Sequence, residues 1–233
     1  MSLELSLAQV RQRIEQAATA AGRDPRSVTL LAVSKTFPAP DVARAAALGQ
    51  TDFGENYVQE AVDKIAALRA DWPALQWHFI GPLQSNKTRD VAAHLDWVHS
   101  IDRLKLAQRL NDQRPADKPP LQVCIQVNID QEATKSGVSA DEAPALALAV
   151  AALPRLRLRG LMCIPAARTD AAAQREPFAR LRHLRDAIAD AHGLALDTLS
   201  MGMSADLEAA ILEGATLVRV GSAIFGTRST RSL

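Results

Sequence analysis

Lys35 is the residue of this sequence that is best placed to act as a nucleophile. It follows an apolar run, 30–33, that has the length and branching of a buried strand, and Pro38 and Pro40 end that strand. In a barrel or an open sheet of parallel strands, the carboxyl ends of the strands form the ligand site. Lys35 is therefore either a nucleophile held in a pocket or a solvated lysine at the surface.

Arg219 is a second candidate ligand-binding residue. It alternates with Val218 and Val220 along a predicted strand, so its side chain points to the opposite face. Because an arginine is not buried cheaply against helices, we expect Arg219 to point into the mouth of a barrel. By the same alternation Lys35 shares a face with Leu31 and Val33, and we take this face as the inward one. A free lysine is neutral at pH 7 only at a cost of about 4.6 kcal/mol, which burial and a nearby cation reduce.

The turn Gly221-Ser222 is a candidate phosphate site. It offers backbone N–H groups and a hydroxyl after the last predicted strand, where barrels of this kind often bind phosphate. Ser200, at the end of the preceding strand, offers another hydroxyl. Glycine and serine also form ordinary turns, but together with Lys35 and Arg219 they suit a phosphate-bearing carbonyl compound. Such a lysine forms Schiff bases with carbonyl substrates or with pyridoxal phosphate.

The elements that position these residues alternate along the whole chain. Leu3, Leu7, Val10 and Ile14 predict an amphipathic first helix that ends near Gly22. Eight expected strands then alternate with helical segments, and these strands lie at 27–35, 51–57, 77–81, 96–101, 121–129, 156–164, 197–203 and 216–226. This pattern predicts a single α/β (β/α)8 TIM barrel with an extra N-terminal helix. An open doubly wound sheet is the alternative, but its glycine-rich turn is absent after the first strand.

Composition excludes several other classes of protein. The net charge is +1 and aromatic residues are 4% of the chain, which disfavours nucleic acid as a partner. The two cysteines lie in apolar runs, as expected of buried thiols in a reducing compartment. No metal-binding spacing is present, and the five histidines are expected to be structural. No signal peptide or membrane-spanning run is visible, which favours a cytoplasmic protein.

Several long motifs resemble one known family. They are AVSKTFP, DFGENYVQE, WHFIGPLQSNK, VNID followed by KSG, GLMCIP, LSMGMSADLEAAI and VRVGSAIFG, and they run in order from residue 30 to residue 226. The chain closely resembles the YggS/PROSC family of pyridoxal-phosphate homeostasis proteins. The resemblance implies a barrel like the N-terminal domain of alanine racemase, with residues 1–233 forming one domain that binds pyridoxal phosphate.

The resemblance also implies a role for each candidate residue. Lys35 carries pyridoxal phosphate covalently as a Schiff base, Arg219 faces the pyridine nitrogen, and Asn56 lies beside the cofactor. The phosphate is held by Gly221, Ser222 and Ser200. Ser204 is the alternative to Ser200, since the motif contains both serines. Lys135 lies near the mouth, either as a second, transient contact for the aldehyde or as a solvated loop lysine.

The expected function is that of a monomeric, non-catalytic protein that buffers or delivers pyridoxal phosphate and so influences vitamin B6 balance. Delivery would involve transient contact with apoenzymes that use this cofactor. An amino-acid racemase is the alternative, but such enzymes add a catalytic tyrosine from a C-terminal domain, and here the single tyrosine is Tyr57. A cofactor-free lyase or phosphosugar enzyme that uses Lys35 is a further alternative.

Overall fold

The computed structural model describes residues 2–132 and 135–226 of the chain. The strands are β1 (Thr29–Val33), β2 (Asp52–Glu55), β3 (Gln76–Phe79), β4 (Trp97–Ile101), β5 (Leu121–Gln126), β6 (Leu156–Met162), β7 (Thr198–Ser200) and β8 (Leu217–Val220). The α-helices are α1 (Leu3–Ala20), α2 (Ala39–Ala47), α3 (Val58–Leu68), α4 (Thr88–His94), α5 (Leu104–Gln113), α6 (Ala143–Ala151), α7 (Ala171–His192), α8 (Leu207–Leu212) and α9 (Ser222–Phe225).

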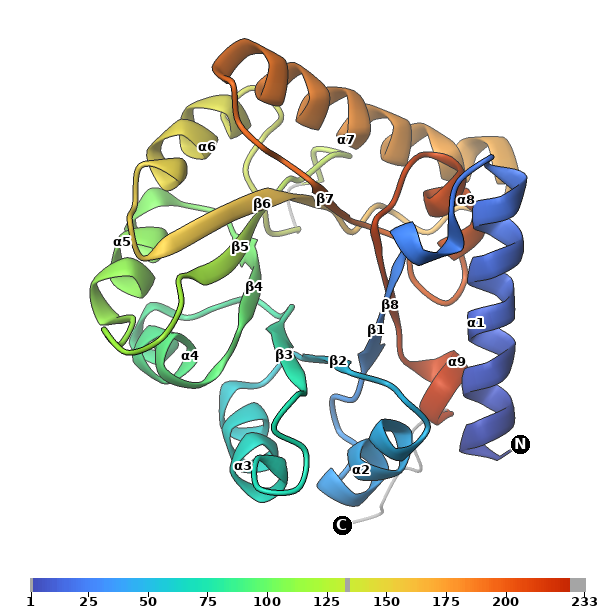
Figure 1. The fold of residues 1–233 in the computed structure, drawn as a ribbon. Coiled ribbons are helices and arrows are strands. Elements are labelled where there is room, and N and C mark those ends of the chain that lie inside the picture. Colours follow the sequence, from blue (N-terminus) through green and yellow to red (C-terminus); the bar gives the residue numbers. More distant parts are fainter. Residues whose placement is uncertain (1, 133–134, 227–233) are drawn as a thin grey trace.

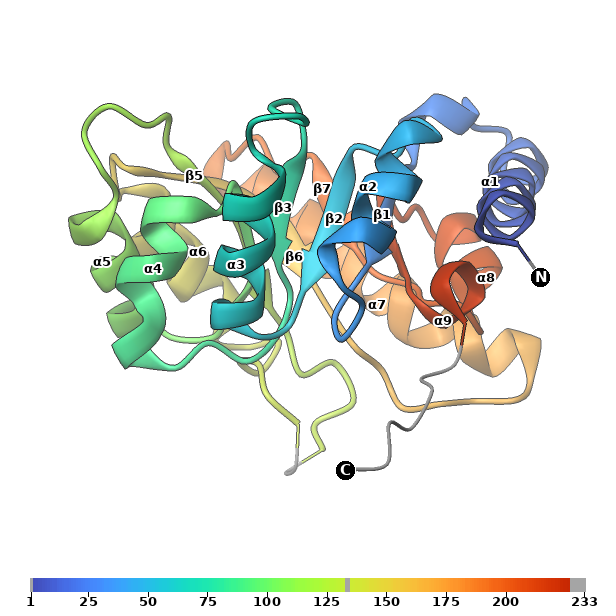
Figure 2. The same ribbon diagram turned by 90° about the horizontal axis from the view of Figure 1, so that it is seen from below.

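The strands form a closed parallel barrel in sequence order, from β1 to β8, with helices around the outside (Figure 1). The barrel closes where β1 pairs with β8, and in that pairing Leu31 lies beside Arg219. Because all the strands run in one direction, their carboxyl ends meet on one side of the molecule. Figure 2 shows the loops that follow β5 and β6 projecting from that side. The predicted barrel is confirmed.

The barrel interior is separate from the core that lies between strands and helices. Leu31, Val33, Ile80 and Leu217 form a small buried cluster of their own. The larger core packs the outward faces of the strands, such as Ala32, Val218 and Val220, against the helices. This division confirms that Leu31 and Val33 form the inward face of β1, the face with which alternation groups Lys35.

The extra N-terminal helix, α1, packs against α8 and α9 at the outside of the barrel (Figure 1). Arg13 of α1 holds Glu208 of α8 in a bidentate ion pair, with Nε–Oε1 and Nη2–Oε2 distances of 2.6 and 2.8 Å. This helix therefore covers the last strand–helix units, on which the candidate phosphate site lies. Within the described residues, no helix has the length and apolar character needed to cross a membrane.

The predicted eighth strand, 216–226, is too long. Strand β8 ends at Val220, and Ser222–Phe225 instead form the short helix α9, in which Phe225 N–H donates to the carbonyl of Gly221. The apolar residues Ala223, Ile224 and Phe225 suggested a continued strand because a short apolar run fits both kinds of element. The correction places Ser222 at the start of a helix that leads the chain out of the barrel.

Candidate functional site: a cavity at the mouth of the barrel

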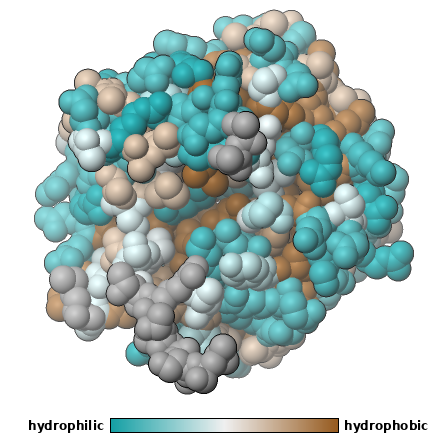
Figure 3. Space-filling view, turned by 180° about the vertical axis from the view of Figure 1, so that it is seen from behind, coloured by the Kyte–Doolittle hydropathy of each residue, from teal (hydrophilic) through white to brown (hydrophobic). Residues whose placement is uncertain are grey.

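A cavity of about 560 Å³ opens at the carboxyl ends of the strands. It is lined by polar residues that the sequence singled out, namely Lys35, Asn56, Ser204, Arg219, Gly221 and Ser222. Apolar residues complete it, among them Ile80, Ile164 and Met203. Figure 3 looks onto this side of the molecule and shows brown hydrophobic atoms between teal hydrophilic side chains. The cavity thus combines an apolar wall with a few polar groups, as small-molecule sites do.

Lys35 lies in the turn after β1, beside the cavity residues Thr36 and Phe37. The ring of Phe37 stacks on Phe225 of α9, with ring centroids 5.1 Å apart. This contact joins the turn of Lys35 to the segment after β8 that contains Ser222. The segments that follow β1 and β8, the two strands that close the barrel, therefore present a lysine and a hydroxyl group to the same cavity.

Arg219 is almost completely buried, yet it lines the cavity. Nη1 donates to the carbonyl and hydroxyl oxygens of Ser200 at 2.6 and 2.7 Å, and Nη2 donates to the carbonyl of Cys163 at 2.8 Å. Burial lowers the pKa of the guanidinium from its ordinary value, but an arginine stays cationic at neutral pH. Three hydrogen bonds hold this cation rigidly at the base of the cavity.

Ser200 is fully buried behind Arg219 and is not among the residues that line the cavity. Its hydroxyl lies 2.8 Å from Nδ1 of His99, whose Nε2 lies 2.9 Å from Nδ1 of His78. His78 Nε2 in turn lies 3.2 Å from a carboxylate oxygen of Asp52, the first residue of β2. A continuous chain of contacts therefore crosses the inside of the barrel from Arg219 to the opposite end.

The hydrogen bonds in this chain run in a single direction. Arg219 is a donor only, so Ser200 accepts from it and donates its own proton to Nδ1 of His99. His99 then donates from Nε2 to His78, and His78 donates to the Asp52 carboxylate. Burial, with His78 and Arg219 nearby, places the pKa of His99 well below its ordinary value, so the ring is neutral. With both rings neutral, the cation at one end and the anion at the other set one tautomer for each histidine.

The candidate phosphate end is formed by Ser204, Gly221 and Ser222. The hydroxyls of Ser222 and Ser204 lie 3.4 Å apart, so both can reach one group. A Cβ at Gly221 would come within 3.2 Å of the Val33 carbonyl, which favours the absence of a side chain where β8 leaves the barrel. Of the two serines that the sequence offered, Ser204 faces the cavity and Ser200 supports Arg219 from behind.

Asn56 lies where this cavity meets a smaller one of about 260 Å³, which Lys135 also lines. Its side-chain oxygen is buried and makes no hydrogen bond to any described residue. A buried polar atom without a partner is costly, so this oxygen is suited to a ligand. Lys135 forms an ion pair with Glu132 at 3.0 Å, which holds it at the rim of the smaller cavity.

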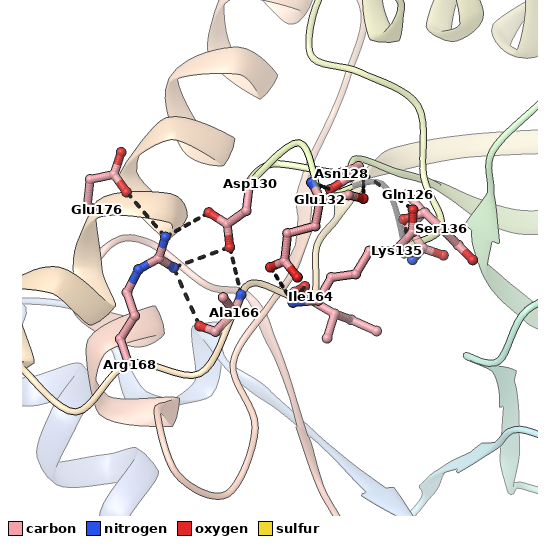
Figure 4. A network of polar contacts seen from close by, with 10 residues as sticks. All are labelled: Gln126, Asn128, Asp130, Glu132, Lys135, Ser136, Ile164, Ala166, Arg168 and Glu176. Atoms are coloured by element: carbon pink, nitrogen blue, oxygen red, sulfur yellow. Dashed lines mark hydrogen bonds and ion pairs between the residues drawn. The ribbon is translucent and has the colours of Figure 1, made fainter.

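Two loops that border the mouth are tied together by Asp130 and Arg168 (Figure 4). Asp130 accepts from the N–H of Ala166 at 2.6 Å and from Arg168 at 2.8 Å. Burial opposes ionisation of Asp130, but these hydrogen bonds hold its pKa below the ordinary value. Asp130, which follows β5, is thereby held against Ala166 and Arg168, which follow β6.

Sequence reasoning did not anticipate the hydrogen-bonded contact between His78 and His99 behind the cavity. His78 and His99 were expected to be structural because they lack metal or triad spacing in the sequence. Both lie on inward faces of neighbouring strands, β3 and β4, and alternation along these strands could have indicated their meeting. The other histidines, His94, His183 and His192, are not buried. Among the described residues, no cluster of three or more His, Cys, Asp or Glu could hold a metal ion.

Comparisons with known proteins identify the class. The family model of the alanine racemase N-terminal domain matches residues 5–229, so the chain belongs to that family. Crystal structures of relatives share its fold: alanine racemase from Corynebacterium glutamicum is 20% identical, with a TM-score of 0.65, over 96% of this chain and 62% of that one.

Curated relatives place the chain more narrowly, among the pyridoxal phosphate homeostasis proteins. The protein of that name from Pseudomonas aeruginosa is 62% identical, covering 96% of this chain and 94% of the relative. The one from Escherichia coli K12 is 57% identical, covering 96% and 95%. PipY of Synechococcus elongatus, solved with pyridoxal phosphate bound, is 37% identical with a TM-score of 0.84, covering 97% and 100%. These matches confirm the resemblance that the sequence motifs indicated.

Proposed function

We propose that this protein binds pyridoxal 5'-phosphate through Lys35 and holds it for buffering or delivery within the cell. The observation that carries the proposal is that one cavity is lined by Lys35, Arg219, Ser204 and Ser222. Relatives that share more than half of its residues carry the name pyridoxal phosphate homeostasis protein. We also propose that residues 1–233 act as one cofactor-binding unit.

The residues of the cavity fit the cofactor. Pyridoxal phosphate supplies an electrophilic aldehyde, a phosphate dianion and a pyridine ring with a hydroxyl group when it is bound. Ser204, Ser222 and the Gly221 turn would hold the phosphate, and the unpartnered oxygen of Asn56 would accept from a ring substituent. Ser204 replaces Ser200 in this assignment, because Ser200 is enclosed behind Arg219.

Lys35 would form the covalent bond. The aldehyde of the cofactor would supply the electrophile, and the amine of Lys35 would hold it covalently with loss of one water. No oxidant or reductant is needed. The attachment is reversible by addition of water or of another amine, which suits a protein that must release what it holds.

Arg219 would face the pyridine nitrogen and limit the chemistry of the bound ring. Arginine can only donate to this nitrogen, so it favours the unprotonated ring, which withdraws electrons weakly. Lys35 and Arg219 are the titratable side chains among the described residues of the cavity. Tyr57, the single tyrosine, does not line it. These features favour holding the cofactor over turnover.

The setting follows from the same features. We propose a cytoplasmic monomer, and the two buried, unpaired cysteines suit a reducing compartment. Transient contact with apoenzymes that need pyridoxal phosphate is the proposed route of delivery. A weak racemase activity is the second candidate, favoured by the fold shared with alanine racemase.

Spectroscopy and chiral analysis test this function. Purified protein is expected to take up pyridoxal phosphate with a visible absorbance band, and Lys35→Ala is expected to lack the band. Incubation of loaded protein with L-alanine or L-serine in deuterated water is expected to leave the Cα hydrogen in place. Deuterium at Cα together with the D-amino acid would support the racemase instead, and a protein that takes up no cofactor would exclude both.

A further inference from the structure

A buried ionic cluster lies directly beside the turn of Lys35 but outside the cavity. Lys64 of α3 has a side chain only 5% exposed, and Glu55 of β2 is fully buried. Nζ of Lys64 lies 2.7 Å from Glu55 Oε1 and 2.6 Å from Glu60 Oε1. None of the three lines the cavity. A charged cluster of this kind is costly to bury, and a hydrophobic replacement is often as stable.

The cluster holds the peptide groups on both sides of Lys35. Before Lys35, the carbonyl of Ser34 accepts from Nζ of Lys64 at 2.7 Å, and the Ser34 hydroxyl donates to Glu55 at 2.6 Å. After Lys35, the N–H of Thr36 donates to Glu60 at 2.6 Å. The ammonium group of Lys64 therefore uses its three donors on Ser34, Glu55 and Glu60.

Thr36 shows that the turn needs this support. Its φ is +70°, a left-handed conformation that residues with a Cβ adopt reluctantly, and β-branched ones most of all. The hydrogen bond from Thr36 N–H to Glu60 offsets this cost because the acceptor is a carboxylate. The conformation in turn decides where the chain directs the side chain of Lys35.

Burial of the cluster raises the pKa of Glu55, while Lys64 beside it favours the carboxylate. The second oxygen of Glu55, Oε2, has no hydrogen-bond partner among the described residues. Glu55 is therefore held mainly by Lys64 and Ser34, and its own role is to fix Lys64. Glu60, by contrast, is partly exposed, so it can be changed without leaving a buried charge alone.

We propose that Lys64 and Glu60 are positioning residues that fix the backbone on either side of Lys35 and so present its amine to the cavity. This inference rests on the proposed function, since it concerns the attachment of pyridoxal phosphate to Lys35. It separates two properties of the site. The speed of covalent attachment depends on the cluster, whereas recognition of the phosphate and the ring depends on Ser204, Ser222 and Arg219.

Two ligands distinguish these properties. Pyridoxal phosphate reports covalent attachment through its visible absorbance, and pyridoxine 5'-phosphate, which lacks the aldehyde, reports recognition alone. For Glu60→Ala, we expect attachment to slow by about tenfold, as for a lost hydrogen bond to a charged group. Binding of pyridoxine 5'-phosphate, measured by calorimetry, is expected to stay within about twofold of wild type.

Matched variants keep the test specific. Glu60→Gln retains an acceptor for Thr36 and is expected to keep most of the wild-type rate. Gln59→Ala, on the exposed face of the same helix, is expected to change neither the attachment rate of pyridoxal phosphate nor the affinity for pyridoxine 5'-phosphate. Adding Thr36→Gly to Glu60→Ala is expected to restore attachment in part, because glycine adopts a positive φ without strain.

The outcomes divide clearly. A wild-type attachment rate in Glu60→Ala would overturn the inference. So would an equal loss in the attachment of pyridoxal phosphate and in the binding of pyridoxine 5'-phosphate. The inference also fails if neither Glu60→Gln nor the added Thr36→Gly restores the attachment rate. If the wild-type protein itself binds pyridoxine 5'-phosphate but never attaches pyridoxal phosphate, the proposed function fails instead. If Glu60→Ala does not fold, the comparison of Glu60→Gln with wild type and Gln59→Ala decides, since a tenfold slower rate in Glu60→Gln would contradict the acceptor role.

Discussion

Nη1 of Arg219 lies 2.7 Å from the hydroxyl oxygen of Ser200, and both side chains are enclosed within the barrel. The guanidinium at the cavity is therefore not an isolated cation. It is one end of a hydrogen-bonded chain that continues through two histidines to a carboxylate at the far end of the barrel. The cavity and the barrel interior are coupled by this chain.

The first prediction separates the two candidate serines. Ser204→Ala is expected to weaken binding of pyridoxal phosphate by about tenfold, as for the loss of one hydrogen bond to a charged group, with little change in stability. Ser200→Ala is expected to lower the free energy of unfolding by about 1–3 kcal/mol, because Arg219 and His99 each lose a buried partner.

Ligand titration and urea unfolding of both variants measure these effects. Ser27→Ala, at an exposed position before β1, serves as the control. The assignment is wrong if Ser200→Ala loses ligand affinity at unchanged stability while Ser204→Ala binds normally.

The second prediction concerns His99. His99→Phe fills a similar volume but removes both ring nitrogens, which leaves the Ser200 hydroxyl and His78 Nδ1 without their buried partners. We expect a loss of about 1–3 kcal/mol in the free energy of unfolding for each orphaned group. His183→Phe, at an exposed position of α7, is the control and is expected to be nearly neutral. Equal free energies of unfolding for the two variants would show that the hydrogen-bonded chain of residues contributes nothing to stability.

The third prediction is a pH dependence. Burial opposes ionisation of Asp52, but hydrogen bonds from His78 and Thr51 hold the pKa of its carboxyl below the ordinary value. The folded state therefore binds this proton more weakly than the unfolded chain does. The stabilisation from Asp52 is complete above the unfolded pKa of about 3.9 and is lost as the pH falls through the lower folded pKa.

Urea unfolding of wild type and Asp52→Asn at a series of pH values checks this sign. The stability difference between them is expected to be largest near neutral pH and to shrink in acid. A difference that grows as the pH falls would contradict the hydrogen-bonded carboxylate at the end of the chain.

The fold was predictable because its signal is local. Most strand segments are short apolar runs, and they alternate with helical segments, so the order of the barrel follows from sequence alone. Alternation along β8 also predicted that Arg219 points inward. At 222–225 the prediction was wrong, because a short apolar run fits a helix as well as a strand, and the predicted strands 121–129 and 197–203 also end earlier, at Gln126 and Ser200.

The hidden parts of the site depend on register, which sequence alone does not reveal. His78, His99 and Ser200 lie on β3, β4 and β7, and only their heights along the barrel bring them together. The burial of Lys64 is equally hidden from sequence reasoning, because a lysine within an amphipathic helix is usually solvated. Its burial follows from how α3 packs on β2, the strand that carries its ion-pair partner Glu55.

The fourth and central prediction is covalent attachment at Lys35. Intact-protein mass spectrometry after incubation with pyridoxal phosphate and borohydride reduction is expected to show one added cofactor, and fragmentation is expected to locate it on Lys35. The adduct should vanish in Lys35→Ala and persist in Lys105→Ala, an exposed control on α5. An unmodified wild-type protein, or an equal adduct in Lys35→Ala, would contradict the account.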